Sequence, residues 1–167
     1  MNANELYEKI QDLTGVENKS WLKHLPENAL ETEGQVQSVR DLSFYLEALI
    51  LELRGPSEKN PNPFEEMDFR LNNNKILKKL RVAFSLKTSD LEEIFASTGE
   101  FYTHHEIGTL FRAEGHKHFK KCDTPTLFTF LAGYKIWNTT KGSEGSLWHY
   151  LISFSNSHCS ETHSNSP

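Results

Sequence analysis

The sequence predicts an all-α protein whose helices form one compact domain. Apolar residues recur at spacings of three and four in segment after segment, whereas the strict alternation of apolar and polar residues that is typical of strands is nearly absent. With 167 residues, 37% of them hydrophobic, the chain is long enough for the core of one compact domain or of two very small ones that share it. The chain shows no secretory signal and no apolar run of the roughly 18 residues that span a bilayer. We therefore expect a cytoplasmic protein.

Residues 1–55 are expected to form an N-terminal helical half. The strongest helix of this half is expected from about Val39 to Arg54, where Ser38 can cap the first turn through its hydroxyl and Gly55-Pro56 ends the helix. Two earlier segments also have helical spacing: a first helix marked by Leu6, Ile10 and Leu13 that ends near Gly15, and a short one around Trp21, Leu22 and Leu25.

Residues 56–68 are expected to be a linker, because prolines are frequent there and apolar residues are scarce. A C-terminal helical half is expected over 69–141. Its predicted helices run from about Asn74 to Leu86, from the capping boxes that start at Ser89 and Thr103, and from Thr124-Pro125 to about Trp137. Residues 142–167 are expected to be a mostly disordered polar tail that contains one aromatic cluster, 147–154.

Charge is distributed unevenly between the two halves. Residues 1–68 carry 14 acidic and 6 basic side chains, whereas residues 69–141 carry 7 acidic and 12 basic ones, and the whole chain has a net charge of −5. Two interpretations remain open: the charges attract each other within the fold or are merely solvated, or the basic half meets an anionic partner.

The C-terminal half also carries a specific pattern. It opens with Asn72-Asn73-Asn74-Lys75-Ile76-Leu77-Lys78-Lys79-Leu80-Arg81, continues through Ala83-Phe84-Ser85-Leu86-Lys87-Thr88, and returns at His116-Lys117, Cys122, Leu127, Phe130, Leu131 and Gly133. This pattern resembles the YehS-like family of small bacterial proteins, to which no biochemical function is assigned. The chain departs from the family at His118, where an Asn is usual, and over Asp123-Thr124-Pro125, where Gly-Asp-Gln is usual.

The resemblance also implies two related halves. Leu42 and Leu46 fall in step with Leu127 and Leu131, which fits an internal duplication, although shared helical periodicity alone gives the same matches.

No pattern of an enzyme is present, because the chain lacks a glycine-rich phosphate loop, a Gly-x-Ser-x-Gly elbow and a carboxylate constellation. Cys122 with His116 or His118 could form a nucleophile and base, but a small core cysteine is the simpler interpretation. The ligand types of a zinc site occur at His104, His105, His116, His118, Cys122 and Asp123, but their spacing matches no zinc motif. We therefore expect no catalytic residues, no metal, no cofactor and reduced thiols at Cys122 and Cys159.

A helical domain without catalytic residues and with an uneven surface charge is most simply a binding module, with a protein as the expected partner. The expected interaction surface is Asn72, Asn73, Asn74, Lys75, Lys78, Lys79, Arg81, Lys87, Arg112, His116 and Lys117.

The alternative partner is nucleic acid, bound through the basic face of residues 75–87 and a helix-turn-helix in which residues 103–112 enter a groove. That helix is a poor reading helix, because Glu106 has the wrong sign and Arg112 is its only permanent cation. The phosphate contacts would be Lys75, Lys78, Lys79, Arg81, Lys87, Lys117, Lys120 and Lys121.

Overall fold

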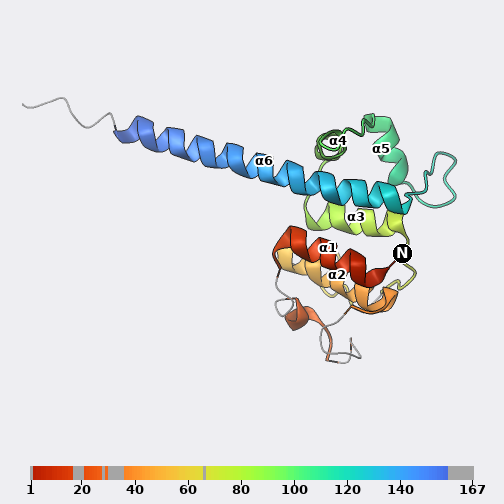
Figure 1. The fold of residues 1–167 in the computed structure, drawn as a ribbon. Helices are drawn as coiled ribbons and strands as arrows, with labels where there is room; N and C mark the ends of the chain where they lie inside the picture. The colour runs from red at the N-terminus through yellow and green to blue at the C-terminus, as the bar shows by residue number, and fades with distance from the viewer. Residues whose placement is uncertain (1, 17–20, 28, 30–35, 66, 158–167) are drawn as a thin grey trace, which may run out of the picture.

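The fold was analysed in a computed structural model that describes residues 2–16, 21–27, 29, 36–65 and 67–157, with side chains described up to residue 141. Every regular element within these ranges is helical, which confirms the all-α prediction. Figure 1 shows the order along the chain: α1 (Ala3–Thr14), the short 3-10 helix η1 (Leu22–His24), α2 (Val39–Arg54), α3 (Asn73–Ala83), α4 (Thr88–Ala96), α5 (His104–Leu110) and α6 (Thr124–Ser157).

Local capping sets most of the helix starts. Ser38 accepts a hydrogen bond from the Asp41 N–H at 3.1 Å and the Asp41 carboxylate accepts from the Ser38 N–H at 3.0 Å, so α2 begins where the sequence predicts. Thr103 and Glu106 form the same reciprocal pair at the start of α5. Two of the predicted starts are wrong by one or two residues.

The first of these is α4, which begins at Thr88 rather than after a Ser89 cap, because the Asp90 carboxylate accepts from the Lys87 N–H at 2.7 Å. The second is α6, where Asp123 caps the helix by accepting from the Thr126 N–H at 2.8 Å, so Thr124 is already helical. At the end of α3, Ser85 adopts a positive φ of 56° and stops the helix before the predicted Leu86.

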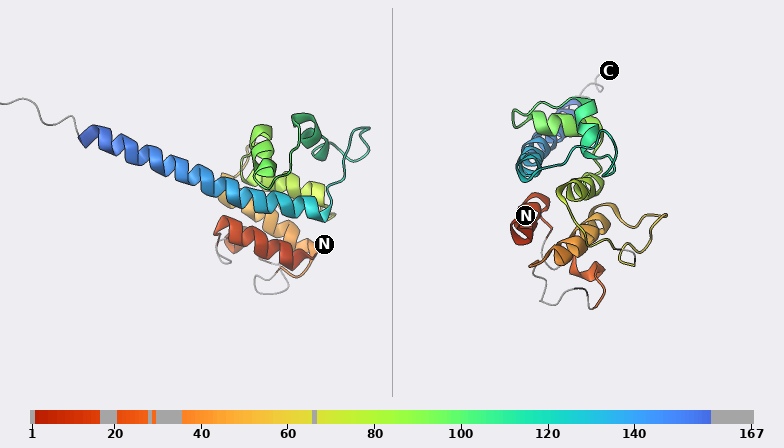
Figure 2. Two further views of the ribbon diagram at one scale, coloured as in Figure 1. Left: turned by 45° about the horizontal axis from the view of Figure 1, so that its top comes forward. Right: turned by 90° about the vertical axis from the view of Figure 1, so that its right-hand side faces the viewer.

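The helices pack as one body around a continuous apolar core. Figure 1 and Figure 2 show α1, α2, α3 and α6 packed side by side: α3 packs on α2 and contacts α6, and α1 packs on both α2 and α6. The buried residues come from both halves of the chain: they include Leu6, Ile10, Trp21, Leu42, Tyr45, Leu49, Ile76, Leu77, Leu80, Ile94, Phe95, Leu127 and Phe130. Burial of apolar surface between the halves therefore holds α3 in the middle of the molecule.

Gly133 allows α4 and α6 to approach closely. A Cβ atom built on Gly133 would lie 2.2 Å from the Ile94 backbone oxygen, which is too short for any real contact. The Ser97 hydroxyl lies 2.7 Å from that oxygen and 3.2 Å from the Gly133 carbonyl oxygen, so it can donate to either one. A glycine at this position is thus required by packing rather than by backbone conformation.

Helix α6 is longer than the sequence predicts, because it continues past Trp137 to Ser157 and extends well beyond the other helices (Figure 1). Contacts with α4 support the part just beyond the predicted end: the Trp137 indole N–H donates to Glu93 at 2.7 Å, and Lys141 pairs with the same carboxylate at 3.4 Å. The remainder of the expected tail, 158–167, lies outside the described residues.

No helix in the described part of the chain is long and apolar enough to cross a membrane.

Candidate interaction site: a groove along α3

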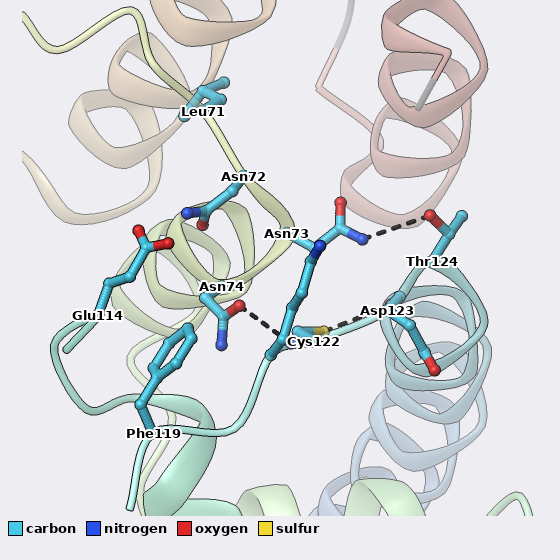
Figure 3. A pocket seen from close by; sticks show the side chains of 10 residues that line it. Leu71, Asn72, Asn73, Asn74, Glu114, Phe119, Cys122, Asp123 and Thr124 are labelled. Carbon is cyan, nitrogen blue, oxygen red and sulfur yellow. Dashed lines mark hydrogen bonds between the residues drawn. The ribbon is translucent and has the colours of Figure 1, made fainter. Parts of the chain in front are cut away.

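Three neighbouring hollows follow α3 over the protein surface, and we call them together the α3 groove. The first, of about 500 Å³, lies where the N-termini of α3 and α6 meet (Figure 3). The second, of about 310 Å³, lies between α3 and residues 110–119. The third, of about 330 Å³, lies between α3 and α2. The first two hollows share Asn72 and Asn74, and the last two share Lys75 and Lys78.

The helical period of α3 explains why this groove is polar on one side. Ile76, Leu77 and Leu80 recur at the spacing that places them on one face, and all three are fully buried in the core. Lys75, Lys78, Lys79 and Val82 fall on the other face and line the groove.

The three asparagines at the start of α3 serve the fold. Asn72 caps the helix by accepting from the Lys75 N–H at 2.9 Å, and Asn73 donates to the Thr124 hydroxyl at 3.3 Å. Asn74 is only 8% exposed; its amide donates to the backbone oxygens of Leu110 and Lys120 at 2.8 Å each, and its oxygen accepts from the Cys122 N–H at 2.9 Å. Figure 3 shows Asn74 pointing at the Cys122 segment. One side chain thereby fixes both ends of the loop that forms the far wall of the groove.

Most basic residues of α3 are paired inside the molecule. Lys75 donates to Asp68 at 2.6 Å and to the Arg70 backbone oxygen at 2.8 Å, and this hydrogen bond holds the pKa of the Asp68 carboxyl well below its usual range. Lys79 pairs with Glu47 of α2.

Arg81 is also occupied, although it lies outside the groove. It donates to the Leu86 backbone oxygen and to the Thr88 hydroxyl, both at 3.2 Å, and its guanidinium lies over the Phe111 ring at 4.7 Å. Arg81 therefore joins the end of α3 to the start of α4 and to the segment after α5.

Lys78 differs from its neighbours. It is exposed, it lines both the second and the third hollow, and no carboxylate in the described part of the chain pairs with it. Arg112 faces the same second hollow, and its guanidinium contacts the His116 ring at 3.4 Å rather than a carboxylate. Among the described residues, the second hollow therefore holds two cations, Lys78 and Arg112, that no carboxylate neutralises.

The structure brings together seven of the eleven residues expected to form an interaction surface. Those that line the α3 groove are Asn72, Asn73, Asn74, Lys75, Lys78, Lys79 and Arg112. The four that line none of the three hollows are Arg81, Lys87, His116 and Lys117; the last three of these are exposed.

Sequence reasoning missed the apolar floor of the groove and its acidic residues. Ile50 belongs to the apolar stripe of α2, which periodicity assigns to the core, and Val82 lies on the basic side of α3. Only the packing of α2 on α3 brings these two residues next to Lys78. Phe111, Phe119 and Glu114 line the second hollow; the Gly115 turn was a signal for a loop there, but not for its orientation.

Four of the eight basic residues proposed as phosphate contacts have partners within the molecule. Lys75, Lys79 and Arg81 are occupied as described, and Lys120 lies over the Tyr102 ring at 5.3 Å. Helix α5 presents acidic neighbours, since His104 contacts Glu92 at 2.9 Å and Glu106 accepts from Thr103 at 2.9 Å. Repulsion between these carboxylates and a phosphate backbone weighs against α5 as a reading helix.

Cys122 is a core residue, as the simpler interpretation of the sequence predicts. Its side chain is 1% exposed, its thiol donates to the Asp123 backbone oxygen at 3.6 Å, and burial raises the pKa of the thiol to about 11. A buried, protonated thiol is a poor nucleophile.

The histidines nearby do not have the arrangement of a metal site. The rings of His105, His116 and His118 lie about 6 Å apart, with centroid distances of 6.2 Å and 5.8 Å. Nδ1 of His116 accepts from the His118 N–H at 3.1 Å, so this nitrogen is already engaged. No group of three or more potential metal ligands lies in ligating geometry among the residues described.

Comparisons with known proteins match part of the chain. The family described as "Protein of unknown function (DUF1456)" matches residues 73–138. The relative titled "Uncharacterized protein YehS", from Escherichia coli (strain K12), is 44% identical over 92 residues; the match covers 55% of this chain and only 58% of that relative. No solved structure matches the chain. The resemblance to the YehS-like family is thus confirmed over about half of the chain, and the DUF1456 family model matches residues 73–138 within it.

Proposed function

We propose that this protein is a non-enzymatic interaction module that binds a segment of another protein in the α3 groove. The observation that carries the proposal is the composition of the groove: apolar side chains from α2, α3 and residues 110–119 line it, and Lys78, which no carboxylate among the described residues pairs, lines two of its three hollows. Concave surfaces with an apolar floor and a few polar groups are typical of binding sites. A cytoplasmic location, with reduced thiols, is part of the same proposal.

The pairing of the cations supports a protein partner over nucleic acid. Affinity for nucleic acid depends on many simultaneous phosphate contacts. Of the eight candidate contacts, Lys75 and Lys79 are neutralised by carboxylates, and Arg81 is held by backbone and hydroxyl oxygens. Three of the eight candidates are thus already engaged within the molecule, which favours a protein partner over nucleic acid.

The contact pattern of the helices supports the internal duplication as a further part of the proposal. If α1 corresponds to α3 and α2 to α6, the contacts within each half are α1 with α2 and α3 with α6, and those between halves are α2 with α3 and α1 with α6. Exchanging the halves leaves this set of contacts unchanged. An experimental structure in which the α1–α2 pair fails to superpose on the α3–α6 pair would contradict the duplication.

The test of the function is a pull-down from native host lysate with the full-length protein, in nuclease-treated and untreated halves. The bait is compared with Lys78→Glu, which reverses the free charge in the groove. The matched control is Lys87→Glu, which reverses another exposed lysine that lines none of the three hollows.

We expect a nuclease-resistant partner that the wild type and Lys87→Glu retain and that Lys78→Glu loses. Binding that disappears after nuclease treatment would favour the nucleic-acid alternative. Equal retention of the partner by all three baits would place the contact elsewhere on the surface.

A further inference from the structure

The second hollow of the α3 groove combines two kinds of surface. Phe111, Phe119 and Leu110 supply an apolar floor, and Lys78 and Arg112 supply positive charge. A segment that fills this hollow must therefore bring apolar area as well as groups that compensate the two cations.

The charges that line this hollow do not cancel. Lys75 is neutralised by Asp68 from the linker, whereas Lys78 and Arg112 have no carboxylate partner among the described residues. Glu114 is the only carboxylate that lines the hollow, and it is exposed. The hollow thus keeps an excess of positive charge on a chain whose net charge is −5.

We infer that the segment bound in the α3 groove is an acidic peptide segment, with carboxylates that contact Lys78 and Arg112 and an apolar side chain that packs on Phe111 and Phe119. This inference rests on the proposed function and names the chemistry of its partner. A neutral or basic segment would cover the two cations without pairing them, which costs their desolvation. The acidic remainder of the surface would repel the same segment, so its binding is directed to the groove.

The test begins with selection of dodecapeptides from a random phage-displayed library on the full-length protein. The affinities of the selected peptides for wild type and variants are then measured by fluorescence anisotropy. Lys78→Gln removes a positive charge from the groove, Glu114→Gln removes the negative one, and Lys87→Gln is the matched control outside it. Ala113→Trp fills the hollow with a large side chain irrespective of charge, since Ala113 lines it and is exposed.

We expect the selected peptides to be rich in Asp or Glu next to an aromatic or aliphatic residue. Lys78→Gln should weaken their binding roughly two- to fivefold and Glu114→Gln should strengthen it by a similar factor, as the usual strength of exposed ion pairs implies. Ala113→Trp should abolish binding, Lys87→Gln should leave it unchanged, and added salt should weaken it.

Two results separate the failure of this inference from the failure of the proposed function. Loss of binding in Ala113→Trp, together with neutral or basic selected peptides or with reversed signs for Lys78→Gln and Glu114→Gln, overturns the acidic partner but leaves the groove as the binding site. Binding that Ala113→Trp does not alter overturns both. Circular dichroism and thermal melting of each variant establish that it is folded before its affinity is interpreted.

Discussion

The first turn of α3 and the turn that follows it differ in what their polar side chains do. At the start of the helix, the side chains form hydrogen bonds within the molecule, as those of Asn72, Asn73 and Asn74 do, and Asn74 is almost fully buried. One turn later, Lys78 is exposed and unpaired among the described residues. Both belong to the stretch that carries the family resemblance. A stretch that carries a family resemblance can therefore contain both residues that stabilise the fold and residues that are available to a partner. Only their side-chain contacts in the structure distinguish the two groups.

The largest effect in this comparison is expected for Asn74→Ala. The change leaves the Leu110 and Lys120 carbonyls and the Cys122 N–H without their partner in a buried place, and this should lower the free energy of unfolding by about 3 kcal/mol. Urea unfolding followed by circular dichroism measures it. Asn73→Ala is the control, with an expected loss below about 1 kcal/mol because it removes one long hydrogen bond. Equal losses would mean that Asn74 does not organise the loop.

A smaller effect is expected from alkaline pH through Cys122. Because the folded protein holds this thiol protonated to a pKa of about 11, and the ordinary value is 9.0, the unfolded chain releases the proton first. The contribution of the Cys122 thiol to the free energy of unfolding is fully present below pH 9. It falls by roughly 2 to 3 kcal/mol as the pH rises from about 9 to 11.

The measurement for Cys122 compares urea unfolding of a Cys159→Ser protein with the same protein carrying Cys122→Ala, at a series of alkaline pH values. The difference between the two isolates Cys122 from the lysines and tyrosines that also titrate there. A difference that stays constant with pH would contradict the buried thiol.

Arg81→Gln should lower the free energy of unfolding by about 1 to 2 kcal/mol, because it removes two hydrogen bonds and the contact with the Phe111 ring. Thermal and urea unfolding measure the loss. Lys87→Gln provides the comparison, as an exposed lysine close by in the chain. An Arg81→Gln protein as stable as Lys87→Gln would move Arg81 from the structural group into the group available to a partner.

The smallest effect on the free energy of unfolding is expected for a change at Lys78. Lys78→Gln removes no hydrogen bond or ion pair within the described part of the chain, so the free energy of unfolding should change by less than about 0.5 kcal/mol. A loss as large as that of Arg81→Gln would show that Lys78 also serves the fold.

The helices could be predicted from the sequence because their causes are local. The Ser38 and Thr103 caps, the stop at Gly15 and the apolar stripes of α2 and α3 are all readable at spacings of three and four residues. The errors occur where a contact between residues far apart in the chain determines where a helix ends or how closely two helices pack. The extent of α6 past Trp137 depends partly on Glu93 of α4, and the tight packing at Gly133 depends on the Ile94 backbone.

Only part of the candidate site could be predicted from the sequence. Periodicity places Lys75, Lys78 and Lys79 on one face, but nothing in the sequence reveals that Asp68 and Glu47 neutralise two of them, since Glu47 lies 32 positions away in the chain. The apolar floor was hidden for a similar reason. Ile50 and Val82 meet only when α2 packs on α3, so each one alone is indistinguishable from an ordinary core or surface residue.

The most direct test of the groove is photo-crosslinking in living host cells, with a benzophenone amino acid placed at residue 78 or at residue 87. Both positions are exposed, and only residue 78 lines the groove. The account predicts a discrete crosslinked protein from residue 78 and none from residue 87. Crosslinks of equal yield to the same protein from both positions, or none from residue 78 while residue 87 gives a product, would contradict it.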